Sequence, residues 1–259
     1  MRIATWNVNS VRARLDRVLA WLAAQQPDVL CLQELKCTDD AFPFEAIRGA
    51  GYRAAVHGQK TYNGVAILSR CEPQDVETGL GDTVDDPQAR LIAATVGGVR
   101  ILSAYVPNGS VVGSEKWAYK LQWLARLREH LDGRCDPAER LVLCGDFNVA
   151  RFDDEVALPD RWGGSVLCHP EGREALERVR AWGFADVVRQ HHPAGGVYSW
   201  WDYRAGAFHR GDGLRLDHVF ATEPLATVCS SAEVDVEERR GKKPSDHAPV
   251  IAAFDVPEA

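Results

Sequence analysis

Two short polar clusters, each beside an apolar run, contain the residue types that hydrolysis of a phosphate ester requires. Asp146 and Asn148 follow the apolar residues 141–144, and Asp246 with His247 precedes another apolar run near the end of the chain. Four consecutive apolar residues predict a buried strand, and open α/β sheets bind ligands beyond the carboxyl ends of their strands. Carboxylate, amide and imidazole groups suit metal-assisted hydrolysis, so we expect chemistry at these clusters.

Other polar residues follow strand-like runs in the same way. Taken singly, Asn7 is explained as a turn cap, Glu34 as a surface carboxylate and Tyr105 as a core aromatic residue. A sheet could nevertheless bring all three to the rim that carries the first cluster. Asp217 lies inside an apolar run, where a carboxylate is costly unless it is paired, and an imidazole is a suitable partner.

The cysteines predict neither a disulfide framework nor a zinc site. Their number is seven, no two have the C-x-x-C spacing, and Cys31 and Cys144 lie in apolar runs, which favours reduced thiols. Without a His and Cys cluster, the candidate metal ligands are oxygen atoms. Glu34, with Asp246 and the Asn7 amide as further candidates, indicates Mg²⁺ or Mn²⁺.

The composition is that of an ordinary globular protein. The 259 residues, 46% hydrophobic and 26% charged, are enough for one large α/β domain, which we expect to span residues 1–259. No apolar stretch approaches about 18 residues and the chain starts with a strand pattern, so we expect a cytoplasmic protein without a membrane partner. The net charge of −7 argues against non-specific coating of nucleic acid but allows a local basic patch.

Apolar periodicity predicts short strands interspersed with helices, which is typical of an α/β fold with helical outer layers. The expected strands are residues 2–5, 29–33, 65–69, 91–96, 100–104, 141–144, 216–220 and 250–254. The expected helices are residues 15–24, 116–131 and 173–182. The least regular stretches, residues 72–90, 149–164 and 202–213, are candidates for substrate-facing loops or for surface segments without a role.

Seven motifs, in order along the chain, resemble those of the exonuclease III/abasic endonuclease family, in its bacterial branch. They are WNVNSVRAR (6–14), LQELK (32–36), YNGVAILS (62–69), GDFN (145–148), YSWWDY (198–203), LRLD (214–217) and SDHAP (245–249). The resemblance implies a four-layer α/β sandwich of two sheets packed face to face with helices outside. It also implies a monomeric, Mg²⁺-dependent DNA repair nuclease, with Mn²⁺ as a substitute, that cuts double-stranded DNA 5′ to abasic sites and acts on recessed or blocked 3′ ends.

The same resemblance implies roles for individual residues. Asp146 would deprotonate the attacking water, held with the help of Asn148. His247, oriented by Asp217, would contact the phosphate oxygens, and Tyr105 would donate a hydrogen bond to the phosphate or the departing oxygen. Glu34 would bind the metal, supported by Asn7, with Asp246 as a less certain second contact.

The resemblance further implies which residues meet the DNA. Trp200, Leu214 and Leu216 match a pocket for a sugar that lacks its base, although paired tryptophans are also typical of a core. Residues that match the DNA-facing positions of relatives are Lys36, Tyr62, Asn63 and Asn108. The basic run at residues 239–243 would place positive charge near the acidic site, although a solvated loop is the usual structure of such a run.

Two departures limit what the resemblance implies. Asn9 stands where animal-type relatives carry an aspartate, which removes a candidate metal carboxylate and favours the bacterial branch. His169 replaces the small hydroxyl residue expected there. If its side chain projects toward the sugar pocket, it would shift the balance among abasic cleavage, exonuclease and phosphatase activities.

Two alternatives stay open at this point. A phosphatase or phosphodiesterase of the wider superfamily, acting on a substrate other than DNA, would keep the catalytic residues but would not need the tryptophan and leucine pocket. A non-catalytic nucleic-acid-binding regulator would be expected to have lost one or more of Glu34, Asp146, Asn148 and His247, and this chain keeps all four.

Overall fold

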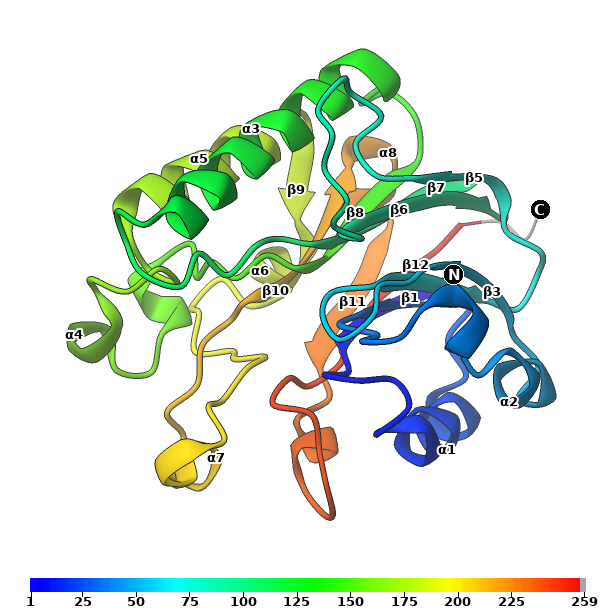
Figure 1. Cartoon of the computed structure of the whole chain (residues 1–259), viewed down its shortest axis with the longest axis horizontal. Coiled ribbons are helices and arrows are strands. Elements are labelled where there is room, and N and C mark those ends of the chain that lie inside the picture. Colours follow the sequence, from blue (N-terminus) through cyan, green and yellow to red (C-terminus); the bar gives the residue numbers. More distant parts are fainter. Residues whose placement is uncertain (257–259) are drawn as a thin grey trace.

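Two six-stranded β-sheets pack face to face, with helices on their outer faces (Figure 1). The computed structural model describes residues 1–256, so the last three residues of the expected single domain lie outside the description. The first sheet has the order β11-β12-β1-β2-β4-β3, with β1 (Arg2–Asn7), β2 (Val29–Gln33), β3 (Arg53–His57), β4 (Val65–Ser69), β11 (Cys229–Val234) and β12 (Val250–Phe254). The second has the order β5-β6-β7-β8-β10-β9, with β5 (Gln74–Thr78), β6 (Leu91–Val96), β7 (Val99–Tyr105), β8 (Leu141–Asp146), β9 (Phe184–Asp186) and β10 (Asp217–Thr222).

The central strands are buried on both faces, which explains why they read as apolar runs. In β1, Ile3 packs into the core between the sheets, whereas Ala4 and Trp6 face the outer helices. In β8, Val142 joins the core between the sheets and Leu143 the outer core of the second sheet. Because side chains alternate along a strand, one apolar run supplies two cores, and the result is the predicted four-layer α/β sandwich.

Helices complete the two outer layers. On the first sheet lie α1 (Leu15–Gln25) and α2 (Phe44–Gly49), and on the second lie α3 (Glu115–Arg134) and α5 (Pro170–Arg180). The Ser114 side chain caps α3 by accepting a hydrogen bond from the Trp117 amide. The short helices are α4 (Pro159–Trp162), α6 (Val187–His191), α7 (Ala207–Arg210) and α8 (Glu223–Ala226), and 3₁₀ turns lie at Asp39–Ala41, Asp153–Glu155, Arg204–Gly206 and Val236–Arg239.

All eight predicted strands and all three predicted helices are present. The main differences are four additional strands, β3, β5, β9 and β11, and the position of α5, which begins at Pro170 and ends before Trp182. The stretches expected to be irregular contain β5, α4 and α7. Within residues 1–256, no helix has the length and apolar character that crossing a membrane requires, and all seven cysteines are free thiols, as expected.

Both sheets direct strand ends to one rim of the molecule. β1 runs parallel to β2, so their carboxyl ends lie at the same edge of the first sheet. β7 runs parallel to β8, so their carboxyl ends lie at the same edge of the second sheet. β10 is antiparallel to β8, and its first residue, Asp217, lies opposite Asp146, the last residue of β8. The polar residues that end or follow these strands are thereby collected where the two sheets meet.

Candidate active site

A hydrogen-bonded set of side chains joins the two sheets at this rim. The Asn7 amide, at the end of β1, donates to Glu34 Oε1 at 2.9 Å and to Asp146 Oδ2 at 2.9 Å. The Tyr105 hydroxyl, at the end of β7, donates to the same Glu34 oxygen at 2.9 Å. Asn7 is fully buried, so these contacts define its orientation and link the metal-ligand candidate Glu34 to Asp146.

The Asp146 carboxylate is enclosed on all sides, with only 1% of the residue exposed. Burial raises the pKa of Asp146 to about 7, although the nearby His247 opposes this shift. The backbone amide of Asn148 donates to Asp146 Oδ1 at 2.9 Å. A carboxyl group that titrates near neutral pH is suited to accept a proton from water.

Asn148 is also held in one orientation. Its amide nitrogen donates to the Val106 carbonyl at 3.0 Å, and its side-chain oxygen accepts from the Asn108 amide at 3.0 Å. The strand before it is tightly packed, because a Cβ atom on Gly145 would lie 1.9 Å from the Ala104 carbonyl oxygen of β7. Only glycine therefore fits immediately before Asp146, which explains the glycine of the GDFN motif.

His247 and Asp217 form a buried pair beside Asp146. His247 Nδ1 lies 2.8 Å from Asp217 Oδ2, and His247 Nε2 lies 3.6 Å from Asp146 Oδ2. Burial, the largest single effect, disfavours the charged imidazole, but the Asp217, Asp146 and Asp246 carboxylates together outweigh it and raise the pKa of His247 to about 10. With Nδ1 donating to Asp217, a protonated Nε2 can donate to a phosphate oxygen.

Ser199 supports this pair although sequence reasoning did not select it. Its hydroxyl donates to Asp217 Oδ2 at 2.6 Å and accepts from the backbone amides of Leu216 and Asp217. Its place between Tyr198 and Trp200 in the YSWWDY motif was the available signal. Because Ser199 is fully buried, it fixes the carboxylate that orients His247.

Lys36 and Asn9 link two of the candidate metal ligands, Glu34 and Asp246. Lys36 Nζ lies 2.8 Å from Glu34 Oε2 and 2.5 Å from Asn9 Oδ1, and the Asn9 amide donates to Asp246 Oδ1 at 3.0 Å. Two hard oxygen donors, Glu34 Oε2 and Asn9 Oδ1, thus contact the cationic Lys36 ammonium, and oxygen donors of this kind fit a divalent metal ion such as Mg²⁺. Lys36 thus contacts Glu34 and Asn9, and its expected contact with DNA stays a prediction.

A second group of possible ligand atoms lies deeper in the site. Oxygen or nitrogen atoms of Asp146, Asp217 and His247 lie within 4.8 Å of one another. The hydrogen bond between His247 and Asp217 occupies one imidazole nitrogen and one carboxylate oxygen of this group.

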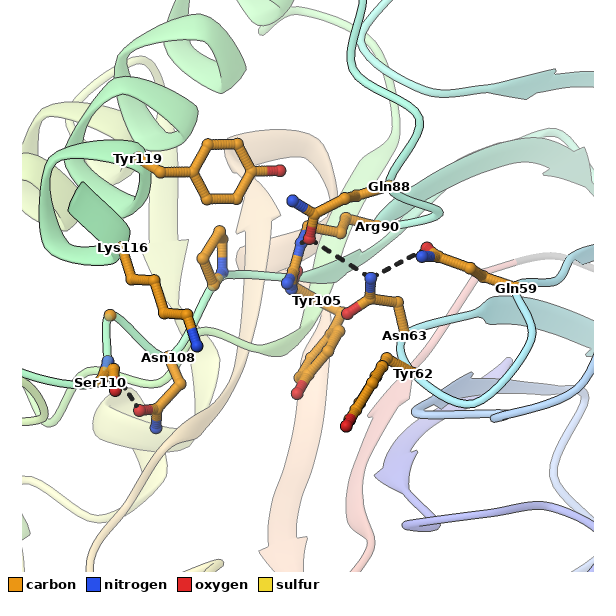
Figure 2. Close-up of a pocket in the computed structure, with 12 residues that line it drawn as sticks. Gln59, Tyr62, Asn63, Gln88, Arg90, Tyr105, Asn108, Ser110, Lys116 and Tyr119 are labelled. Carbon is orange, nitrogen blue, oxygen red and sulfur yellow. Dashed lines mark hydrogen bonds between the residues drawn. The ribbon is translucent and has the colours of Figure 1, made fainter.

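Three of the four residues expected to face DNA lie beside Tyr105. Tyr62, Asn63 and Asn108 line a cavity of about 530 Å³ that Tyr105 borders (Figure 2). Tyr62 is 68% exposed, whereas the Asn63 amide is fixed by hydrogen bonds to Gln59 and Gln88.

The cavity at Trp200 is not lined by all the residues that were expected to form the sugar pocket. Trp200 borders a cavity of about 480 Å³ together with Trp162, Val112 and Leu167. The two leucines expected there, Leu214 and Leu216, are 0% and 1% exposed and pack beneath Trp200 in a buried cluster. They support the wall of the cavity instead of lining it, because the Trp200 strand segment pairs with Leu214 in an antiparallel bridge.

His169 does not line this cavity. Its Nδ1 accepts a long hydrogen bond, 3.4 Å, from the Glu171 amide at the start of α5, and its ring packs edge-on against Trp117.

The basic run at residues 239–243 is not solvated along its whole length. Its first residue, Arg239, is buried against Trp201 and Phe208.

Lys120 is a second supporting residue that sequence reasoning missed. It is fully buried on α3, and its ammonium donates to the carbonyls of Asn108 at 3.2 Å, Asn148 at 2.8 Å and Val166 at 2.7 Å. Burial lowers the pKa of Lys120 to about 7, with the Asp146 charge opposing. A lysine within the apolar face of the predicted helix, three residues after Trp117, was the signal.

Comparisons with known proteins show the family and agree with this fold. Residues 4–247 match the model of the Endonuclease/Exonuclease/phosphatase family. The chain is 34% identical to exodeoxyribonuclease III of Haemophilus influenzae, with 98% of this chain and 100% of that protein covered. The chain is also similar to an AP endonuclease structure from Archaeoglobus fulgidus, with 43% sequence identity and a TM-score of 0.96. The match covers 99% of this chain and 100% of the Archaeoglobus chain.

A third relative was solved with DNA. The structure of a Neisseria 3′ phosphatase bound to a product DNA hairpin is 45% identical, with a TM-score of 0.95, and covers 99% of this chain and 100% of its own. These matches extend over nearly the whole chain and include the rim where the two sheets meet. The chain therefore belongs to the Endonuclease/Exonuclease/phosphatase family, in its exonuclease III/abasic endonuclease branch.

Proposed function

We propose that this protein is a metal-dependent DNA repair nuclease that hydrolyses phosphodiester bonds 5′ to abasic sites. We further propose 3′→5′ exonuclease and 3′-end-cleaning activities on recessed or blocked 3′ ends of double-stranded DNA. The observation that carries the proposal is the buried contact among Asp146, His247 and Asp217, with His247 Nε2 3.6 Å from Asp146 Oδ2 and Nδ1 bonded to Asp217.

In the proposed reaction, Asp146 accepts a proton from the attacking water. Its raised pKa, about 7, places its ionised form close to neutral pH, where a general base is most effective. Asn148, fixed by Val106 and Asn108, orients that water beside the carboxylate.

His247 and Tyr105 act on the phosphate. The charged imidazole, held by Asp217, donates to the oxygen on which negative charge grows in the transition state. The Tyr105 hydroxyl, now bonded to Glu34, is placed to donate to the phosphate or to the departing oxygen. Burial raises the pKa of this hydroxyl well above its usual value, so Tyr105 acts as a neutral donor.

Glu34, Asp246 and Asn7 are the residues that we propose to hold the metal. A bound Mg²⁺, or Mn²⁺ in its place, would neutralise charge on the phosphate oxygens and favour attack of water on the phosphorus atom. The support for this metal is the chemistry of the oxygen donors: Glu34 bonds to Lys36, and Asp246 is linked to Lys36 through Asn9. Hard oxygen ligands suit Mg²⁺ and Mn²⁺.

The experiment that tests the function compares three substrates with Mg²⁺, with Mn²⁺ and with EDTA. They are a duplex with one tetrahydrofuran abasic analogue, an intact duplex with a recessed 3′ end, and a nicked duplex with a 3′-phosphate. We expect metal-dependent cleavage 5′ to the analogue, and the three rates rank the activities. Absence of metal-dependent cleavage on all three would contradict the proposal.

The third substrate is included because the Neisseria relative is a 3′ phosphatase bound to product DNA.

We propose that the protein acts as a monomer in the cytoplasm, where the seven free thiols would stay reduced. Light scattering of the purified protein tests the oligomeric state.

A further inference from the structure

The first arginine of the basic run at residues 239–243 is a buried cation that the proposed mechanism does not use. Arg239 ends the 3₁₀ turn Val236–Arg239 and is 6% exposed, whereas the next arginine, Arg240, is exposed. Within residues 1–256, no carboxylate oxygen lies within 4.0 Å of the Arg239 nitrogens. Burial of a charge without a paired anion is costly, so other groups must stabilise the guanidinium at this position.

Three aromatic rings surround the guanidinium. Its central carbon lies 5.2 Å from the ring centre of Phe208, 5.6 Å from that of Tyr203 and 5.9 Å from that of Trp201. The faces of aromatic rings attract cations, most strongly where water is excluded. Tyr203 also donates through its hydroxyl to the Pro244 carbonyl at 2.9 Å. This aromatic cage, formed by Trp201, Tyr203 and Phe208, therefore holds the cation beside the segment that leads into the SDHAP motif.

Inside the cage, the guanidinium contacts two backbone carbonyls. Nη1 donates to the Ser245 carbonyl, and Nη2 donates to the Trp201 carbonyl at 3.4 Å. The Trp201 backbone amide in turn donates to the Asp246 carbonyl at 3.0 Å. Arg239 thus connects the YSWWDY segment to the SDHAP segment at the residue before Asp246.

Ser245 links this contact to the reaction centre. It is fully buried, and its hydroxyl donates to the Asn7 carbonyl at 2.7 Å and accepts from the His247 amide at 3.2 Å. The peptide that Arg239 holds is therefore the one from which the backbone enters Asp246 and His247. Misplacement of a reacting group by about 1 Å is enough to cost about 10²-fold in rate.

We propose that Arg239 is a positioning residue of the reaction centre: by holding the Ser245 carbonyl from the aromatic cage, it fixes the backbone that places Asp246 and His247. The inference rests on the proposed nuclease function, in which Asp246 contacts the metal and His247 contacts the phosphate. It gives the first residue of the basic run a role that requires no contact with DNA.

Three variants change this contact in steps. Arg239→Met removes the charge and both donors. Arg239→Lys keeps the charge, but a single ammonium lacks the planar fork that reaches two carbonyls. Val236→Ala is the matched control, because Val236 lies in the same 3₁₀ turn and packs against the Trp201 cluster without making either hydrogen bond. Urea unfolding of the three variants gives the loss of stability with which each loss of activity is compared.

The first readout separates catalysis from DNA binding. We expect the single-turnover rate on the tetrahydrofuran duplex, at saturating DNA and Mg²⁺, to fall by about 10–10²-fold in Arg239→Met. Arg239→Lys should lose less, and Val236→Ala should cleave like the wild type even where it is equally destabilised. Anisotropy in EDTA should give both Arg239 variants the wild-type slope of log K against log salt, whereas loss of a phosphate contact would lower that slope by about 0.9.

The second readout reports the position of His247 without DNA or metal. Its Nδ1 lies 2.8 Å from Asp217 Oδ2, so the proton on this nitrogen should give a low-field NMR resonance, identified by its loss in His247→Gln. If the backbone at His247 moves, this hydrogen bond lengthens. We expect the resonance to shift, or to be lost through exchange with water, in Arg239→Lys and Arg239→Met but to stay unchanged in Val236→Ala.

The proposal is overturned if both Arg239 variants cleave like Val236→Ala and keep the His247 resonance, or if their salt slope falls as it does for a lost phosphate contact. Should Arg239→Met fail to fold, Arg239→Lys decides by the same criteria. A wild type that cleaves none of the three DNA substrates would instead contradict the nuclease function, and the His247 resonance would still test the role of Arg239. The two failures are therefore distinguishable.

Discussion

At the scale of single residues, the hydrogen bonds around Asp146 show what its two oxygens must do. Oδ2 accepts from Asn7 and Oδ1 from the Asn148 amide, so both oxygens face donors. Asp146→Asn keeps the shape of the side chain but cannot take a proton and presents an NH₂ group to one of these donors. We expect the single-turnover rate to fall by about 10²–10⁴, while binding of abasic DNA changes little.

Anisotropy and quenched-flow measurements on the same duplex check both parts of this prediction. Asp153→Asn, at an exposed carboxylate, is the control and should cleave like the wild type. An Asp146→Asn protein with half the wild-type rate would exclude Asp146 as the base.

Glu34 is predicted to determine metal affinity. Glu34→Gln replaces an anionic oxygen ligand with a neutral one and also breaks the ion pair with Lys36. We expect a higher Mg²⁺ midpoint for activity and weaker Mn²⁺ binding in calorimetry without DNA. Glu45→Gln, at an exposed position on α2, is the matched control. Equal Mn²⁺ affinity for Glu34→Gln and wild type would show that Glu34 is not a ligand.

The pKa of His247 predicts a pH dependence. Burial disfavours its charged form, but Asp217 raises its pKa to about 10, so wild-type His247 should remain a charged donor up to that pH. Asp217→Asn removes the main cause of this increase, and the alkaline limb of kcat/KM should move to lower pH. Ser199→Ala removes a hydrogen bond to the same carboxylate without removing its charge, so its limb should move less. Identical limbs in wild type and Asp217→Asn would show that Asp217 does not set the charge of His247.

At the scale of elements, α3 connects three loops of the site through one side chain. Lys120→Met should destabilise the protein by about 1–3 kcal/mol, because three buried carbonyls lose their donor. Lys116→Met, at an exposed position of the same helix, should change stability by less than about 0.5 kcal/mol. Urea unfolding of the three proteins measures both effects.

The stability difference between wild type and Lys120→Met should also depend on pH. Burial lowers the pKa of native Lys120 to about 7, whereas the unfolded side chain keeps its proton up to about pH 10. Between these values the unfolded state binds more protons, so wild-type stability rises with pH and the difference should be larger at pH 9 than at pH 7. A difference independent of pH would show that native Lys120 stays protonated.

The elements also show what could be predicted from the sequence and what could not. β2, β4, β6 and β12 have the predicted bounds because their apolar runs are buried on both faces. β5 was missed because all five of its residues are exposed, and β9 because it has only three residues. Edge strands of this kind form through pairing with a neighbour, which periodicity does not report.

For the site, too, local patterns in the sequence were informative, whereas contacts between distant segments could not be predicted. The polar residues at strand ends could be identified from the apolar runs before them, as for Asp146 and Glu34. The burial of Leu214 and Leu216 beneath Trp200 could not, since it depends on a bridge between distant segments. The same holds for Lys120, whose partners are backbone carbonyls of other loops.

At the scale of the whole molecule, the reaction centre depends on the contact between the two sheets. Asn7 and Glu34 belong to the first sheet, and Tyr105 and Asp146 to the second, so the site exists only while the sheets are packed together (Figure 1). One core, with residues from both sheets, fills the space between them. This shared core predicts that the chain folds as one domain.

The prediction is tested by weakening the shared core from each side. Ile67 in β4 and Ile101 in β7 are fully buried between the sheets, and replacing either with alanine should cost about 2–5 kcal/mol. If the chain is one cooperative unit, each variant still unfolds in a single transition at lower urea concentration, with coincident changes in circular dichroism and tryptophan fluorescence. Two separated transitions, with Ile67→Ala shifting only one and Ile101→Ala only the other, would show that the sheets fold independently. In that case the active site would be lost at the first transition, because neither sheet alone carries both Glu34 and Asp146.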